Sequence, residues 1–217
     1  MLLIIADAAP SLARSKTSRI EVRYVLPKNP AHQPIYDRLK QQRVLKRLQE
    51  FLSPFRLPRT LQVSLAGCDG EADAFYSDDA ITICYEYIDE LWKRMPAEKT
   101  ATGIMPIDTI VGPFFDTSLH EFAHALFDML DLPVLGREED AADQVAAYIY
   151  LQLGSAEARR LTSSGVMEVK RTSAWIAPPP YSRFGGRVSQ KLDRVCIGHA
   201  DRLFDGPGRF VRSFWIQ

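Results

Sequence analysis

The chain contains 217 residues, of which 46% are hydrophobic and 10% are aromatic. This composition supports a buried core and excludes a disordered chain. Lysine plus arginine and aspartate plus glutamate number 27 each, so the formal net charge is zero and gives no indication of a nucleic-acid partner. No apolar run approaches the about 20 residues that a transmembrane helix needs.

The length fits one domain with at most a small appendage. We expect residues 1–18 to form an N-terminal segment and residues 19–217 to form a single domain. Residues 1–9 have an apolar core followed by small residues, like the end of a signal peptide, although they lack a basic start and are too short for a complete one. A first β-strand is the alternative interpretation.

Alternating apolar and polar residues predict a β-strand over residues 19–26. Residues 34–54 carry apolar residues at helical spacing and predict one amphipathic helix. Its inward face would consist of Ile35, Leu39, Val44, Leu45, Leu48, Phe51 and Leu52. The opposite face is basic, a pattern that can bind membranes or partners, but acidic residues interrupt it and favour an ordinary solvated face.

Residues 61–65 alternate again and predict a second strand. Two short apolar runs, at residues 74–76 and 80–85, flank a turn at residues 77–79 and predict a hairpin.

Residues 86–95 predict a short helix. Residues 96–113 contain proline, glycine and threonine and predict a loop. The next helix would begin in residues 116–118, all good N-cap residue types, and would end at Leu132-Pro133.

That helix contains His120, Glu121 and His124 in the pattern His-Glu-x-x-His. Residues four apart lie on one helical face, so both imidazoles can reach one zinc ion while the glutamate acts on its water. Two buried core histidines are the alternative. The chain has only four histidines, and the coincidence of two of them around a glutamate favours a metal site.

A second helix is predicted over residues 137–148, with Glu139 and Asp143 four apart on one face. One carboxylate could bind zinc while the other orients a ligand histidine. The favourable interaction of acidic residues with a helix N-terminus is an alternative explanation for Glu138, Glu139 and Asp140, but it does not explain Asp143 one turn later.

The C-terminal third is harder to interpret, although residues 188–204 predict a helix. A zinc peptidase needs a donor opposite the metal to stabilise the oxyanion. His199 is our tentative choice, in competition with Tyr148, Tyr181 and Arg183, and a core histidine is the alternative interpretation of His199.

His120-Glu121-x-x-His124 followed by Glu139-x-x-x-Asp143 resembles the gluzincin zinc peptidases, such as thermolysin. More closely, the chain resembles an uncharacterised bacterial family of predicted zinc metallopeptidases, classed as a domain of unknown function. The matching segments are residues 57–59, 68–76, 81–86, the His-Glu-x-x-His helix and residues 132–143. The chain departs from the family pattern at Asp73, where asparagine is usual, and near His199.

The resemblance implies that His120, His124 and Glu139 bind zinc, that Glu121 is the catalytic base and that Asp143 orients a ligand. The family is doubly acidic at residues 138–139, so Glu138 is a rival third ligand.

The resemblance also implies a zincin-like α+β fold. In such a fold a small mixed or antiparallel sheet packs on a backing helix, next to the His-Glu-x-x-His helix and a following helix that bears the glutamate. The segment 74–84 would border the cleft and pair with extended substrate. An ordinary sheet edge is the alternative for that segment.

Three cysteines leave one unpaired. Cys68 and Cys84 flank the predicted hairpin, and a disulfide between them is our preferred interpretation because the N-terminus and the family resemblance both indicate an exported protein, periplasmic or secreted. Two reduced core cysteines of a cytoplasmic protein are the alternative. Cys196 is expected to be a buried thiol.

The sequence therefore predicts a zinc-dependent metallopeptidase with a peptide or protein substrate. A non-peptide zinc amidase or hydrolase is one alternative. The other is a catalytically silent peptide-binding module with structural zinc, although a structural site has no need of Glu121.

Overall fold

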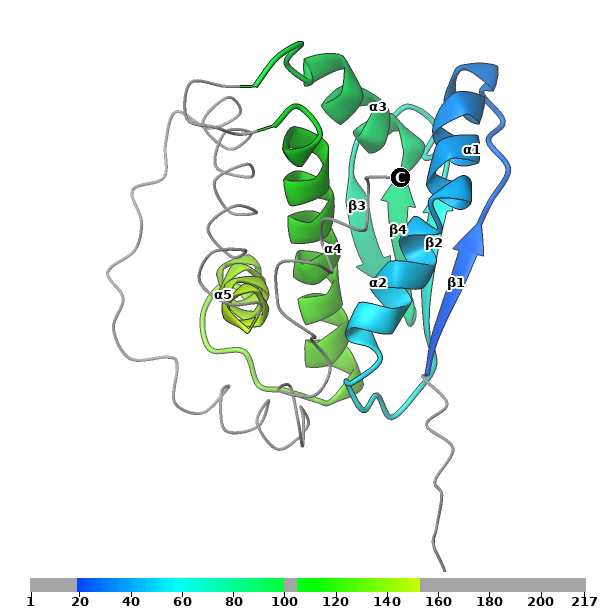
Figure 1. The fold of residues 1–217 in the computed structure, drawn as a ribbon. Coiled ribbons are helices and arrows are strands. Elements are labelled where there is room, and N and C mark those ends of the chain that lie inside the picture. Colours follow the sequence, from blue (N-terminus) through cyan, green and yellow to red (C-terminus); the bar gives the residue numbers. More distant parts are fainter. Residues whose placement is uncertain (1–18, 100–104, 153–217) are drawn as a thin grey trace, which may run out of the picture.

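The computed structural model describes residues 19–99 and 105–152 (Figure 1). Over these ranges the chain forms a mixed four-stranded sheet and five α-helices, so the predicted α+β class is confirmed. None of the described helices is long and apolar enough to cross a membrane. The predicted N-terminal segment and the predicted helix over residues 188–204 lie outside the described residues.

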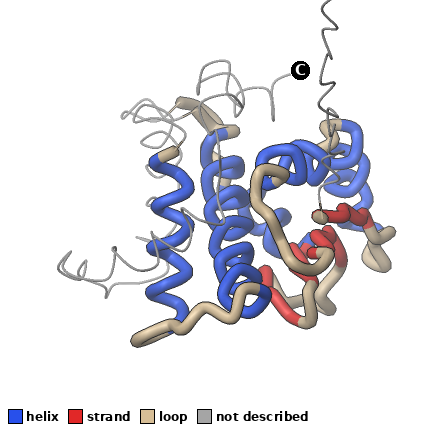
Figure 2. Tube along the Cα trace, turned by 90° about the horizontal axis from the view of Figure 1, so that it is seen from below, coloured by secondary structure: helices blue, strands red, loops and turns tan. Residues whose placement is uncertain are grey.

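The sheet has the order β1-β2-β4-β3. Strands β1 (Ile20–Tyr24), β2 (Leu61–Ala66) and β4 (Ala80–Cys84) are parallel, whereas β3 (Ala74–Ser77) is antiparallel to β4 and forms one edge of the described sheet. All four strands match the predicted segments. Alternate residues point to the same face, where they are buried: Ile20, Leu61, Val63, Leu65, Ile81 and Ile83. The helices cover this face (Figures 1 and 2).

The predicted helix over residues 34–54 is wrong in one respect, because the chain forms two helices there. After a short 3₁₀ turn (Pro30–His32), α1 covers Gln33–Gln41 and α2 covers Val44–Leu52. Arg43 between them adopts a left-handed conformation with φ of 53°. All seven residues predicted to face inward are buried.

Tyr24 on β1 explains how the break between these helices is tolerated. Its hydroxyl donates a hydrogen bond of 3.3 Å to the carbonyl of Leu39 and accepts one of 2.9 Å from the amide of Leu45. The hydroxyl therefore satisfies one backbone group on each side of the break. This contact comes from a distant strand, so the local helical pattern gave no signal of it.

Helix α3 (Tyr85–Arg94) follows β4 directly and confirms the predicted short helix. Helix α5 (Glu138–Leu151) confirms the predicted second helix, and its inward residues Ala142, Val145, Ala146 and Ile149 are buried. Helix α5 packs beside α4 (Asp108–Met129), the His-Glu-x-x-His helix (Figures 1 and 2).

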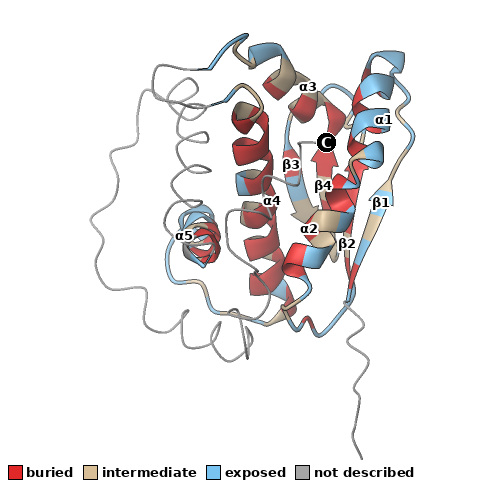
Figure 3. Cartoon of the chain, in the orientation of Figure 1, coloured by how far each residue is buried: buried red, intermediate tan, exposed pale blue. Residues whose placement is uncertain are grey.

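The predicted start of α4 in residues 116–118 is wrong, because the helix begins at Asp108, about two turns earlier. Pro113 lies inside it, which costs about 3 kcal/mol relative to alanine. The added turns bury four large apolar side chains, each worth about 1.5–3 kcal/mol, which offsets that cost. They are Ile110, Val111, Phe114 and Phe115. Figure 3 shows α4 buried along most of its length.

A disulfide joins Cys68, in the loop after β2, to Cys84 at the end of β4. The two Cα atoms are 5.5 Å apart, within the normal range for a disulfide. Glu86 supports the same loop, because its carboxylate accepts hydrogen bonds from the amides of Cys68 and Gly70, at 3.0 and 3.3 Å. The loop between β2 and β3 is therefore anchored to the start of α3.

We expect one reactive thiol per chain when the protein is unfolded without reductant, and three after reduction. Reduction should lower the free energy of unfolding by about 3 kcal/mol, since the cross-link spans 16 residues. Alkylation followed by peptide mass spectrometry checks this, with Cys196→Ser as the control that removes only the expected free thiol. Three thiols alkylated in unreduced protein made in an oxidising compartment would contradict the prediction.

Candidate metal centre

The two histidines of the His-Glu-x-x-His motif lie one turn apart on α4. Their ring centroids are 4.9 Å apart, and the Nε2 atom of His120 is 3.1 Å from the Nε2 atom of His124. Both side chains are largely covered, with 21% and 13% of their surfaces exposed. The helical spacing therefore directs both inner ring nitrogens at one point.

Helix α5 places Glu139 at the same point. One carboxylate oxygen of Glu139 is 3.0 Å from Nε2 of His120, and the other is 3.5 Å from Nε2 of His124. A tetrahedral zinc with bonds of about 2.0–2.1 Å would separate its ligand atoms by about 3.3–3.4 Å. The three side chains therefore fit a zinc ion in both spacing and donor type, and their ligand atoms all lie within 4.8 Å of one another.

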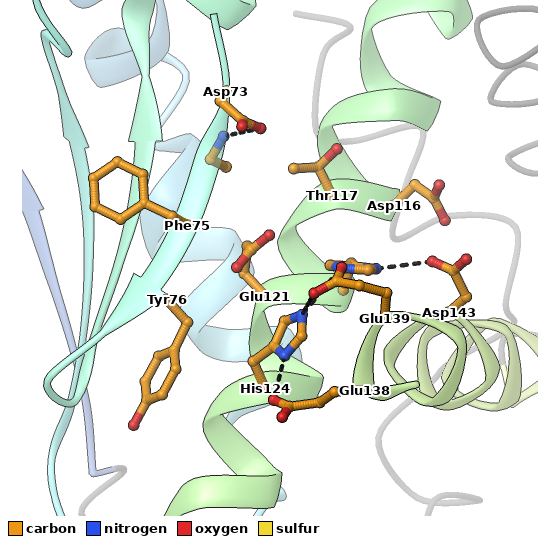
Figure 4. A pocket seen from close by; sticks show the side chains of 12 residues that line it. Asp73, Phe75, Tyr76, Asp116, Thr117, Glu121, His124, Glu138, Glu139 and Asp143 are labelled. Carbon is orange, nitrogen blue, oxygen red and sulfur yellow. Dashed lines mark hydrogen bonds and ion pairs between the residues drawn. The ribbon is translucent and has the colours of Figure 1, made fainter. Parts of the chain in front are cut away.

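The outer nitrogens of both histidines also meet carboxylates from α5 (Figure 4). Nδ1 of His120 is 2.8 Å from Asp143, and Nδ1 of His124 is 2.8 Å from Glu138. A carboxylate on the outer nitrogen fixes the tautomer and the ring orientation of a metal-binding imidazole. The role predicted for Asp143, to orient a metal-binding histidine, is compatible with this contact and stays a prediction.

Glu138 does not occupy the place of a third ligand in this geometry. It reaches the outer nitrogen of His124, while Glu139 lies between the two inner nitrogens. The sequence carried a signal for this arrangement, because the helix begins with two successive glutamates. The fixed rise of a helix lets Glu138, Glu139 and Asp143 of α5 meet different nitrogens of two rings on α4.

Glu121 occupies the neighbouring stripe of α4 and faces the edge strand β3 (Figure 4). Only 8% of its surface is exposed, and the backbone of Tyr76 hydrogen-bonds to it. Burial raises the pKa of this carboxyl above its ordinary value, although the nearby histidines act in the opposite direction. A raised pKa suits a group that must take up and later release a proton near neutral pH.

These residues line one cleft of about 680 Å³ between β3, α4 and α5. Its acidic residues are Asp73, Asp116, Glu121, Glu138, Glu139 and Asp143. Within the described part of the chain, no lysine or arginine lines it. Such a cleft has a negative potential that attracts cations.

The carboxylates also change the acidity of their neighbours. The hydrogen bond with Asp143 is the main cause that raises the pKa of His120 to about 9. Asp116, one turn before His120, was predicted only as a helix cap. Its side chain lines the cleft and hydrogen-bonds with Tyr150, and loss of hydration together with Asp143 raises its pKa to about 6.

The oxyanion donor remains a prediction. His199, Tyr181 and Arg183 lie outside the described residues, and Tyr148 is not among the residues that line the cleft. Tyr76 does line the cleft, but its phenol is turned away from the imidazoles (Figure 4) and bonds to Asp128 at 2.7 Å.

Comparison with known proteins agrees with this chemistry at a coarse level. A family model named DUF4344, with the description "Putative metallopeptidase", matches residues 24–175 and so covers every residue of the centre described above. No curated protein and no solved structure matches the chain. The matched segment is more than two thirds of the 217 residues. The chain therefore belongs to this family of putative metallopeptidases.

Proposed function

We propose that this protein is a zinc-dependent peptidase of the gluzincin type, with a zincin-like fold. The observation that carries the proposal is the convergence of two inner histidine nitrogens and one carboxylate, with a buried glutamate in the same cleft. The donor set favours zinc, because two imidazoles and one carboxylate leave a position open for water or substrate.

His120, His124 and Glu139 would hold the ion, and Asp143 and Glu138 would hold the two rings in position. A bound zinc ion supplies polarisation of the substrate carbonyl and lowers the pKa of water towards about 7. Glu121 takes the proton released from the water and returns it to the departing amine nitrogen.

Strand β3 supports a peptide substrate over a small amide. It forms the edge of the described sheet and lines the cleft opposite α4. An extended peptide can add to an edge strand as a further strand of the sheet. A non-peptide amidase would use the same metal chemistry, and a binding module with structural zinc would take up metal without hydrolysing anything.

We also propose that the protein functions in an oxidising compartment, as an exported protein. The disulfide between Cys68 and Cys84 supports this, because structural disulfides are rare in the reducing cytoplasm.

Glu121→Gln should retain about one zinc per chain and lose activity by about 10²–10⁴-fold, because the variant keeps the ligands but lacks the base. Metal analysis and hydrolysis of a mixed peptide library measure the two effects. Glu50→Gln, the same chemical change at an exposed position on α2, is the matched control. A wild-type protein that takes up no divalent metal, or binds zinc but cleaves no peptide, would refute the peptidase assignment.

The three carboxylates of α5 should differ when each is replaced by alanine. Glu139→Ala removes a ligand, so most zinc should be lost. Glu138→Ala and Asp143→Ala each free one imidazole and should weaken zinc binding by about 10–100-fold. Competition with a chelator of known affinity measures all three side by side. If Glu138→Ala proves the most damaging, the roles of Glu138 and Glu139 are exchanged.

Zinc affinity should fall continuously as the pH drops below about 9. In the metal-free protein the pKa of His120 is raised to about 9, so a proton must leave before the ring can bind metal. The loss should approach about tenfold per pH unit, with about one proton released per zinc bound at pH 7. Chelator competition between pH 6 and 9 measures it.

Asp143→Asn is the control for this pH dependence, because Asp143 is the main cause of the raised pKa. In that variant the pKa of His120 should be lower, so the pH dependence should begin at a lower pH than in the wild type. A wild-type affinity that is constant between pH 7 and 9 would contradict the assignment.

A further inference from the structure

Four side chains from separate segments form one polar cluster beside the cleft, which we call the Arg59 cluster: Arg59, Tyr76, Asp79 and Asp128. The Nη2 atom of Arg59 donates to Asp79 and to Asp128, at 2.7 Å each, and its Nε atom donates to Asp79 at 3.0 Å. The hydroxyl of Tyr76 lies 2.7 Å from Asp128 and 3.3 Å from Asp79. One guanidinium and one phenol thus bridge the same two carboxylates.

The Arg59 cluster joins the two walls of the cleft. Tyr76 and Asp79 belong to β3 and to the β3–β4 turn, whereas Asp128 lies on α4, one turn beyond His124. Arg59 comes from the loop before β2. The cluster therefore fixes the hairpin against the C-terminal end of α4, while the cleft lies beside it.

Tyr76 is held at two points. Its hydroxyl belongs to the Arg59 cluster, and its backbone hydrogen-bonds to Glu121. The position of the phenol and the position of the buried glutamate are consequently connected through one residue of β3. Within the described residues, the side chains of Arg59, Asp79 and Asp128 make no hydrogen bond to either histidine of the candidate metal centre.

We propose that the Arg59 cluster is a positioning device that sets β3 at a fixed spacing from α4, so that the strand can receive an extended peptide next to Glu121. This inference rests on the proposed peptidase function. Arg59, Asp79 and Asp128 are positioning residues, because they act on the substrate only through β3.

The exposure of the cluster argues for a geometric role over a stabilising one. The exposed fraction of the side chain is 47% for Arg59, 56% for Asp128 and 35% for Asp79. Ion pairs this exposed contribute little to the free energy of folding, because water screens them. Removing the guanidinium leaves two carboxylates on one phenol, and their repulsion would push the turn away from α4. The effect should be local to the hairpin.

Hydrogen exchange tests this role without relying on catalysis. In Arg59→Gln, the backbone amides of residues 74–79 should exchange about fivefold faster than in the wild type, because the hairpin opens locally more often. Lys93→Gln is the matched control, because it removes an exposed cation paired with Asp89 on the remote helix α3. Tyr76→Phe, which loses only the hydroxyl, should reproduce the effect. Exchange in residues 74–79 that is no faster than in the control would overturn the proposal.

Steady-state kinetics then distinguish positioning from general damage. Arg59→Gln should raise KM for long peptides by about fivefold and change KM for the shortest cleaved peptides less, because only long substrates pair along β3. Zinc affinity should equal that of the wild type, since the ligands are untouched. Equal losses for long and short substrates would overturn the proposal. If Arg59→Gln exchanges faster but the wild-type protein cleaves no peptide, the proposed function alone would be refuted.

Discussion

The close approach of two imidazole nitrogens, 3.1 Å apart on successive turns of one helix, is the constraint on which this structure depends. Two imidazoles this close to each other and to Glu139 need the protons of their inner nitrogens directed at the carboxylate, or a cation in place of those protons. Carboxylates on both outer nitrogens keep those atoms engaged and leave the inner nitrogens to face Glu139. This arrangement depends on the helical spacing of the two rings on α4 and on the position of α5 beside them.

The apolar core holds the helices and the edge strand in the required places. Phe122 and Leu126 alternate with the site residues along α4 and are fully buried, so one helix carries the core on one side and the candidate metal centre on the other. On α5, small residues such as Ala142 and Ala146 are buried against the core, whereas Glu139 and Asp143 remain exposed. Small side chains permit close helix packing, and this close approach brings three carboxylates within reach of two rings.

Periodicity predicted most elements because strands and amphipathic helices report burial directly in the sequence. The His-Glu-x-x-His spacing predicted the two rings, since helical geometry alone places them. The failures share one cause. The break at Arg43 depends on Tyr24, and the early start of α4 depends on burial that compensates for Pro113. Contacts between residues distant in sequence decided both, and local patterns do not contain them.

Under the proposed function, metal binding and the docking of α5 are coupled. Glu138, Glu139 and Asp143 all come from α5, so a small displacement of that helix changes the contact with the inner nitrogens and both outer ring contacts together. Conversely, an ion held between the helices stabilises the docked position by its binding free energy, since it binds only that arrangement. The buried residues of α5 supply the part of this docking that does not depend on the ion. At the proposed metal site, the affinity for the ion is therefore linked to the packing of α4 against α5.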